Sequence, residues 1–142
     1  MFGLTKKKPD ETTQRVRQAL GPDVAVVLSA SCCMAGTAAA DGQVEAVARA
    51  ALKEAGLDWP VLTITVTEAQ SALARIGREL GPAEAQLAQQ VSELFATKGL
   101  GAFPVLLIDQ RVLAYGGVPG LPLVLSALAS RESARVGHAN AA

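Results

Sequence analysis

Apolar positions along the chain fall into two patterns. Short apolar runs rich in β-branched residues are typical of buried strands, and they lie at 24–29, 61–66, 105–108 and 111–115. Around these runs, apolar residues recur at three- and four-residue spacing, which is typical of amphipathic helices. The predicted helices span about 10–20, 42–55, 67–81, 82–98 and 119–130. The expected order of elements is therefore α-β-α-β-α-α-β-β-α.

This order restricts the topology of the sheet. The first two strands are joined through a helix, so they should pair in parallel with a right-handed crossover. The last two strands are separated only by Asp109-Gln110, which predicts a tight turn and an antiparallel hairpin. The predicted fold class is α/β, with a mixed four-stranded sheet and helices on both of its faces.

The chain length favours one domain. A chain of 142 residues suffices for a single hydrophobic core and is too short for two comfortable ones. We expect an N-terminal lead and an extra helix over 1–22, where Gly21-Pro22 ends the helix. The α/β domain should cover 23–130, and a flexible C-terminal tail should cover 131–142.

Composition and charge exclude several functional classes. Half of the residues are apolar and only 18% are charged, so the chain is not of the disordered class. Thirteen Lys and Arg balance thirteen Asp and Glu. Zero net charge argues against nucleic-acid binding, which depends on excess positive charge. No apolar run approaches the roughly 18 residues of a membrane span, and we expect a cytoplasmic protein.

The two cysteines, Cys32 and Cys33, are adjacent and lie between the first strand and the following helix. Helix N-termini carry partial positive charge and unpaired N–H groups. A thiolate at such a place is stabilised, which makes it a better nucleophile and a better metal ligand at neutral pH. If Cys32 instead faces the core from the end of the strand, it is inert. The position between strand and helix favours the reactive alternative.

Adjacency limits the chemistry of these two thiols. Consecutive Cα atoms lie about 3.8 Å apart, which is below the usual disulfide span of roughly 4.4–6.8 Å. A bridge between them would close a strained and oxidising ring. Two neighbouring thiolates can instead converge on one soft ion, such as Cu(I), Zn(II) or As(III). Two ligands do not complete a tetrahedral site, so a small thiol or a second chain, as in a homodimer, would contribute. No tightly bound cofactor is expected.

Phe103-Pro104, directly before the hairpin, is the second feature that carries chemistry. Proline lacks an N–H and is tolerated at the first position of a strand. Together with the cysteine loop and Gly116-Gly117, this stretch resembles the thioredoxin superfamily, and the match covers about 23–130. The resemblance implies that the Phe103–Pro104 peptide bond is cis and that it faces the cysteines.

The chain is similar, within that superfamily, to the arsenical-resistance metallochaperones called ArsD. The stretches that carry this resemblance are Cys32-Cys33, the long helical middle at 69–98, the hairpin residues 103–109 and Gly117-Val118-Pro119. The resemblance implies a thioredoxin-like fold, capture of As(III) or Sb(III), and delivery of that ion to an efflux ATPase as the protein partner.

Three functional hypotheses follow from these features. The first is a metallochaperone-like protein that captures and transfers a soft metal or metalloid ion through Cys32 and Cys33. The second is a thiol–disulfide oxidoreductase, in which one cysteine attacks a substrate disulfide and its neighbour resolves the mixed disulfide. The third is a non-catalytic interaction subunit with structural cysteines, whose docking surface is an exposed grouping of Leu100, Phe103 and Leu121.

Overall fold

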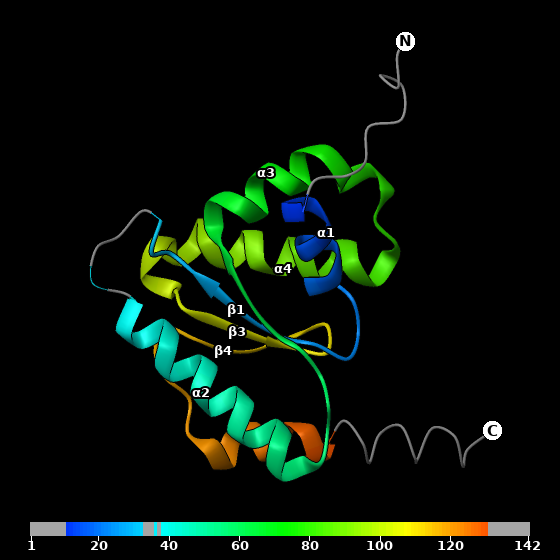
Figure 1. The fold of residues 1–142 in the computed structure, drawn as a ribbon. Helices are drawn as coiled ribbons and strands as arrows, with labels where there is room; N and C mark the ends of the chain where they lie inside the picture. The colour runs from blue at the N-terminus through cyan, green and yellow to red at the C-terminus, as the bar shows by residue number, and fades with distance from the viewer. Residues whose placement is uncertain (1–10, 33–35, 37, 131–142) are drawn as a thin grey trace, which may run out of the picture.

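The computed structural model describes residues 11–32, 36 and 38–130 (Figure 1), so the expected lead and C-terminal tail lie outside the described residues. The helices and strands follow the predicted order. They are α1 (Glu11–Ala19), β1 (Ala25–Ser29), α2 (Ala38–Ala55), β2 (Val61–Thr65), α3 (Val66–Ile76), α4 (Pro82–Lys98), β3 (Val105–Ile108) and β4 (Arg111–Tyr115), followed by a helical segment at 121–130. Two short 3₁₀ helices, η2 (Gly77–Glu79) and η3 (Gly99–Ala102), flank α4.

The four strands form one mixed sheet in the order β2-β1-β3-β4. β1 pairs with β2 in parallel and with β3 antiparallel, and β3 and β4 form the expected antiparallel hairpin. Every residue of β1 and β3 is buried, which is the pattern of central strands covered on both faces. The predicted α/β class and the mixed four-stranded sheet are confirmed.

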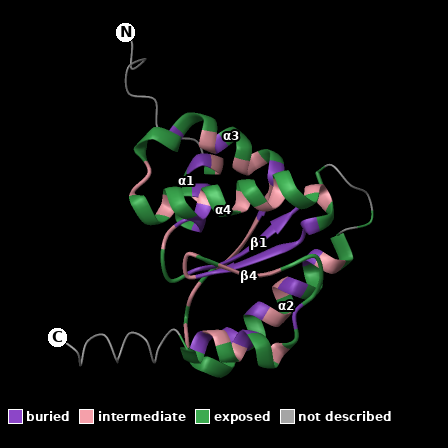
Figure 2. Ribbon diagram, turned by 180° about the vertical axis from the view of Figure 1, so that it is seen from behind, coloured by how far each residue is buried: buried purple, intermediate pink, exposed green. Residues whose placement is uncertain are grey.

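Helices cover both faces of the sheet, as predicted. α1, α3 and α4 lie on one face, and α2 and the segment 121–130 lie on the other (Figure 1). Successive side chains of a strand point to opposite faces, so Val26 and Leu28 of β1 join the first core and Ala25 and Val27 join the second. Figure 2 shows the buried strands between helices whose outer faces are exposed. No helix in the described ranges has both the length and the apolar composition of a membrane span.

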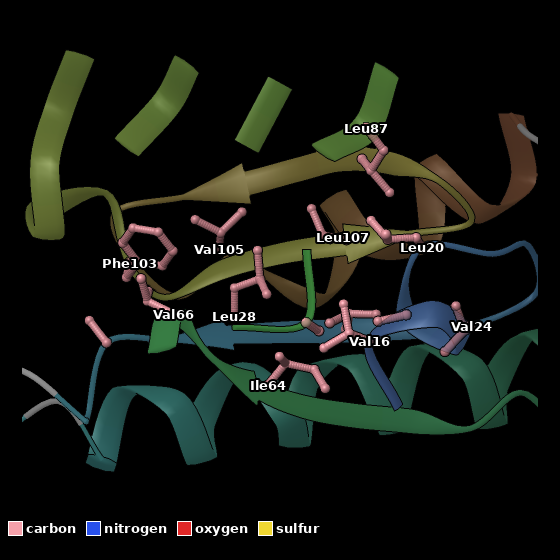
Figure 3. Packing of buried hydrophobic residues seen from close by; sticks show 14 of the residues in the cluster. Val16, Leu20, Val24, Leu28, Ile64, Val66, Leu87, Phe103, Val105 and Leu107 are labelled. Atoms are coloured by element: carbon pink, nitrogen blue, oxygen red, sulfur yellow. The ribbon is translucent and has the colours of Figure 1, made fainter. Parts of the chain in front are cut away.

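The N-terminal helix α1 belongs to the first core. Val16 and Leu20, at and just after this helix, are 2% and 6% exposed, and they lie beside the sheet in Figure 3. Arg15 donates to the Thr63 carbonyl oxygen at 2.5 Å and to Glu68 Oε2 at 3.2 Å. The guanidinium therefore bridges β2 and the first turn of α3, which fixes α1 against both elements.

The bounds of two helices, α2 and α3, differ from the predicted ones. α2 begins at Ala38 instead of residue 42, because the alanines that precede Asp41 are strong helix formers. α3 begins at Val66, where Thr65 accepts from the Glu68 backbone N–H at 3.1 Å and Glu68 Oε1 accepts from the Thr65 N–H at 2.9 Å. This reciprocal capping box satisfies two otherwise unpaired N–H groups at the start of the helix. The same helix ends at Ile76 and continues only as η2.

Replacing Thr65 by alanine should lower the free energy of unfolding by about 1 kcal/mol, because the side-chain acceptor of the capping box is lost. Thr65→Ser keeps a hydroxyl acceptor and should unfold like the wild type. Urea titrations followed by far-UV circular dichroism measure both variants. An unchanged midpoint in Thr65→Ala would show that the cap contributes nothing.

Candidate functional site

The residues that the sequence predicts to be functional lie at one edge of the sheet. β1 and β2 are parallel with Ser29 opposite Thr65, so the segments that follow both strands emerge at the same edge. β3 runs antiparallel, with Val105 opposite Leu28, so the residues before β3 begin at this edge too. The register thus brings Cys32, the start of α3 and Phe103-Pro104 to one end of the molecule.

Cys32 is exposed at this edge. Its sulfur lies 3.1 Å from Thr67 Oγ1, and the threonine hydroxyl donates to the sulfur. Cys32 therefore does not face the core. Cys33, the second predicted site residue, lies outside the described residues.

The described contact between Cys32 and a helix N-terminus is made with α3. Thr67, whose hydroxyl donates to the Cys32 sulfur, belongs to the first turn of this helix. α2, the helix that the sequence suggested, begins at Ala38, six positions after Cys32. A hydrogen bond from a neutral hydroxyl to a thiolate stabilises the charged form, so α3 supplies the contact that favours a reactive Cys32.

Phe103 and Pro104 are both buried, and the peptide bond between them is cis, as the resemblance implied. The expectation that Phe103 is exposed as part of a docking surface is wrong, since the residue is only 6% exposed. Its ring packs edge to face against Phe95, with the ring centroids 6.0 Å apart at 69°. The other two members of that predicted surface, Leu100 and Leu121, are partly buried. Phe103 therefore belongs to the first hydrophobic core.

A buried polar network joins the end of β1 to the first turn of α2. The Ser29 hydroxyl at the end of β1 donates to Asp41 Oδ2 in the first turn of α2 at 2.5 Å. Ser29 Oγ also accepts from the Ser31 N–H at 3.0 Å and lies 2.8 Å from Ser31 Oγ. Asp41 is 8% exposed, and within the described residues its Oδ1 has no hydrogen-bond partner. The network joins the two elements between which the cysteine segment runs.

Sequence reasoning missed Thr67, Ser29 and Asp41, although two of them leave a signal. Asp41 precedes Val44 by three positions and therefore lies on the apolar stripe of its helix. Ser29 ends an otherwise apolar strand. Polar residues at buried positions require hydrogen-bond partners, so both could have been marked as members of a network. Thr67 can be recognised as a site residue only from the structure, because the parallel pairing of β1 and β2 brings the start of α3 next to Cys32.

The described residues do not form a complete metal site. No group of three or more His, Cys, Asp or Glu side chains within them is placed to hold a metal ion. Cys32 offers one thiolate, so further donors for a soft ion would come from Cys33, from a small thiol or from a partner.

The class that the geometry defines is an α/β domain with an exposed thiol at the carboxyl edge of a parallel strand pair. Comparisons with protein-family models, with curated proteins and with solved structures find no match for this chain.

Thr67→Val should shift the alkylation of Cys32 to higher pH, because the valine cannot donate a hydrogen bond to the thiolate. Measured in a Cys33→Ser background, the pH midpoint of the alkylation rate should rise, because the thiolate loses its hydrogen-bond donor. Thr67→Ser keeps the hydroxyl and should keep the midpoint. The same midpoint in Thr67→Val and Thr67→Ser would show that the Thr67 hydroxyl does not stabilise the Cys32 thiolate.

Ser29→Ala should destabilise the fold by about 1–3 kcal/mol, because it removes the only donor described for a buried carboxylate. Ser71→Ala is the matched control, since Ser71 is exposed on α3 outside this network and the change should stay within about 0.5 kcal/mol. Urea unfolding of the two variants compares them directly. Equal losses in both would mean that burial of Asp41 does not depend on Ser29.

Proposed function

We propose that the chain is a thioredoxin-like thiol protein whose Cys32-Cys33 pair captures a thiophilic metal or metalloid ion and transfers it to a protein partner. The observation that carries this proposal is the exposed Cys32 sulfur, which accepts a hydrogen bond from Thr67 at the edge where the sheet elements converge. As(III) and Sb(III) are the ions that the sequence resemblance suggests.

The fold supports the thioredoxin-like part of this proposal. A sheet in the order β2-β1-β3-β4 with a single parallel pair, and with helices on both faces, agrees with the expected architecture. The cis bond before Pro104 starts at the same sheet edge as the cysteine segment. Both features are those that the resemblance to the superfamily implies.

Capture of trivalent arsenic by two thiols is a ligand exchange without any change of oxidation state. Two thiols and one molecule of arsenous acid give two As–S bonds, and two of the three hydroxyl groups leave as water. The third position on arsenic remains for a small thiol or for a thiolate of the acceptor, so the ion can pass on by stepwise exchange. The efflux ATPase suggested by the resemblance is the proposed acceptor, and the reducing cytosol is the proposed location.

A thiol–disulfide oxidoreductase is the second candidate, and the Thr67 contact favours it as well, because it stabilises the attacking thiolate. In that reaction the Cys32 thiolate attacks one sulfur of a substrate disulfide, and the first substrate thiolate leaves. The Cys33 thiolate then attacks the Cys32 sulfur, and the second substrate thiolate leaves. The substrate gains two electrons, and the cysteine pair is oxidised to a disulfide.

The full chain should bind one equivalent of phenylarsine oxide, an arsenical that requires two thiols, and intact-mass measurements under native conditions should show the adduct. Cys32→Ser and Cys33→Ser should each weaken binding by about 100-fold, because the second As–S bond forms within the molecule. Ser126→Ala is a control remote from the cysteines in the sequence, and it should bind like the wild type.

Catalytic turnover distinguishes the thiol–disulfide oxidoreductase from the metallochaperone. Reduction of glutathione disulfide in the presence of a regenerating reductant should stay at the uncatalysed rate if the chain only carries an ion. Catalytic turnover without tight arsenical binding would favour the oxidoreductase. Wild-type arsenical affinity in both cysteine variants would eliminate the metallochaperone proposal.

A further inference from the structure

A pocket of about 260 Å³ lies where the last turns of α2 meet the loop that leads into β2. The turn that ends α2 is held by two backbone hydrogen bonds. Gly56, with a φ of 75°, donates its N–H to the Lys53 carbonyl at 3.1 Å, and the Leu57 N–H donates to the Leu52 carbonyl at 2.9 Å. These bonds form a Schellman motif, which ends a helix in a sharp reversal. Figure 1 shows the chain turning back from the end of α2 toward the sheet, so the loop lies next to the final turns of the helix.

Charged side chains of both signs line the pocket. Arg49 and Lys53 lie one turn apart on α2, and Asp58 lies in the returning loop. The Arg49 guanidinium already donates to Glu45 Oε1, from Nε at 3.2 Å and from Nη2 at 2.7 Å. Lys53 and Asp58 are exposed, and neither is in an ion pair with any residue that the structure describes. One ammonium group and one carboxylate are therefore available to a ligand in the same pocket.

The rest of the lining is apolar and includes an aromatic ring. Trp59, Leu57 and Val61 are half-buried and pack on the second core, and Leu52 is 3% exposed. A cavity of about 150 Å³ admits a benzene ring, so this pocket has room for a ring together with several polar atoms. Ring–ring contact with the indole stabilises an aromatic occupant beyond the effect of the buried area.

We propose that this pocket binds a free amino acid with an aromatic side chain. The ring lies against Trp59, the carboxylate contacts Lys53, and the ammonium group contacts Asp58. An aromatic acid without an amine would be repelled by Asp58, and an aromatic amine without a carboxylate would be repelled by Lys53 and Arg49. A residue inside a peptide has lost both charges to its amide bonds, so the free amino acid is the form that matches the lining.

This site is separate from the proposed ion site. Val61 pairs with Ala25 at the start of β1, whereas Cys32 follows Ser29 at the end of that strand. The two sites therefore lie at opposite ends of the sheet and share no residue. Binding at this pocket does not require the thiols.

Trp59 is the only tryptophan of the chain, so its fluorescence reports directly on the pocket. L-Phenylalanine does not absorb at wavelengths that excite only tryptophan, and titration of the full chain with it should give a saturable change in emission. 3-Phenylpropionate lacks the ammonium group and 2-phenylethylamine lacks the carboxylate. Each should bind about two- to fivefold more weakly, as expected for the loss of one contact between exposed charges. L-Leucine lacks the ring and should bind about two- to tenfold more weakly.

Two variants test the charged contacts. Asp58→Asn should remove the preference for L-phenylalanine over 3-phenylpropionate, because the amide carries no charge to attract the ammonium group. Lys53→Gln should reduce the preference over 2-phenylethylamine in the same way. Glu54→Gln is the matched control, since Glu54 is exposed on the same helix and does not line the pocket, and it should bind like the wild type.

Far-UV circular dichroism shows that the variants are folded, and all three substitutions are at exposed positions. Absence of a saturable change in the wild type would overturn the proposal, and so would equal affinities for L-phenylalanine and 3-phenylpropionate. An unchanged preference in folded Asp58→Asn would place the ligand elsewhere and would likewise overturn it. A Cys32→Ser variant should bind L-phenylalanine normally. Failure of the arsenical experiment therefore leaves this site intact, and failure of the phenylalanine experiment leaves the thiol proposal intact.

Discussion

Because β1 and β2 run parallel, with Ser29 opposite Thr65, the segments that follow these two strands leave the sheet side by side. This pairing places Cys32 against the first turn of α3 and allows Thr67 to reach its sulfur. The antiparallel entry of β3 adds Phe103-Pro104 to the same edge. A shift of the β1 register by one residue would turn each of its side chains to the opposite face of the sheet and would displace all of these groups.

The stability of this edge comes from the two hydrophobic cores on opposite faces of the sheet. The central strands are buried on both sides, and α1 closes the first core while the Arg15 guanidinium ties it to β2 and α3. Glu68 accepts from Arg15 and also completes the capping box at Thr65. One carboxylate thus fixes the N-terminal helix and the start of the helix that contacts Cys32.

The polar network of Ser29, Ser31 and Asp41 has a different role. A buried carboxylate is unfavourable unless it is hydrogen-bonded, and Asp41 has a partner for Oδ2 in Ser29. The position of Asp41 in the first turn of α2 also places its charge near the positive end of that helix. The network connects the end of β1 to the start of α2, and this connection limits how far the ends of the cysteine segment can move apart.

Local patterns of apolar residues determined the element order, the parallel pair and the hairpin, because period and turn chemistry are properties of the sequence itself. The sequence also showed that the two cysteines are adjacent and identified Phe103-Pro104 as a candidate feature directly before the hairpin. The tertiary structure decided that Phe103 is buried against Phe95 and that Thr67 donates to Cys32. These features depend on which side chains meet across long sequence separations, and they are set by strand register and helix packing.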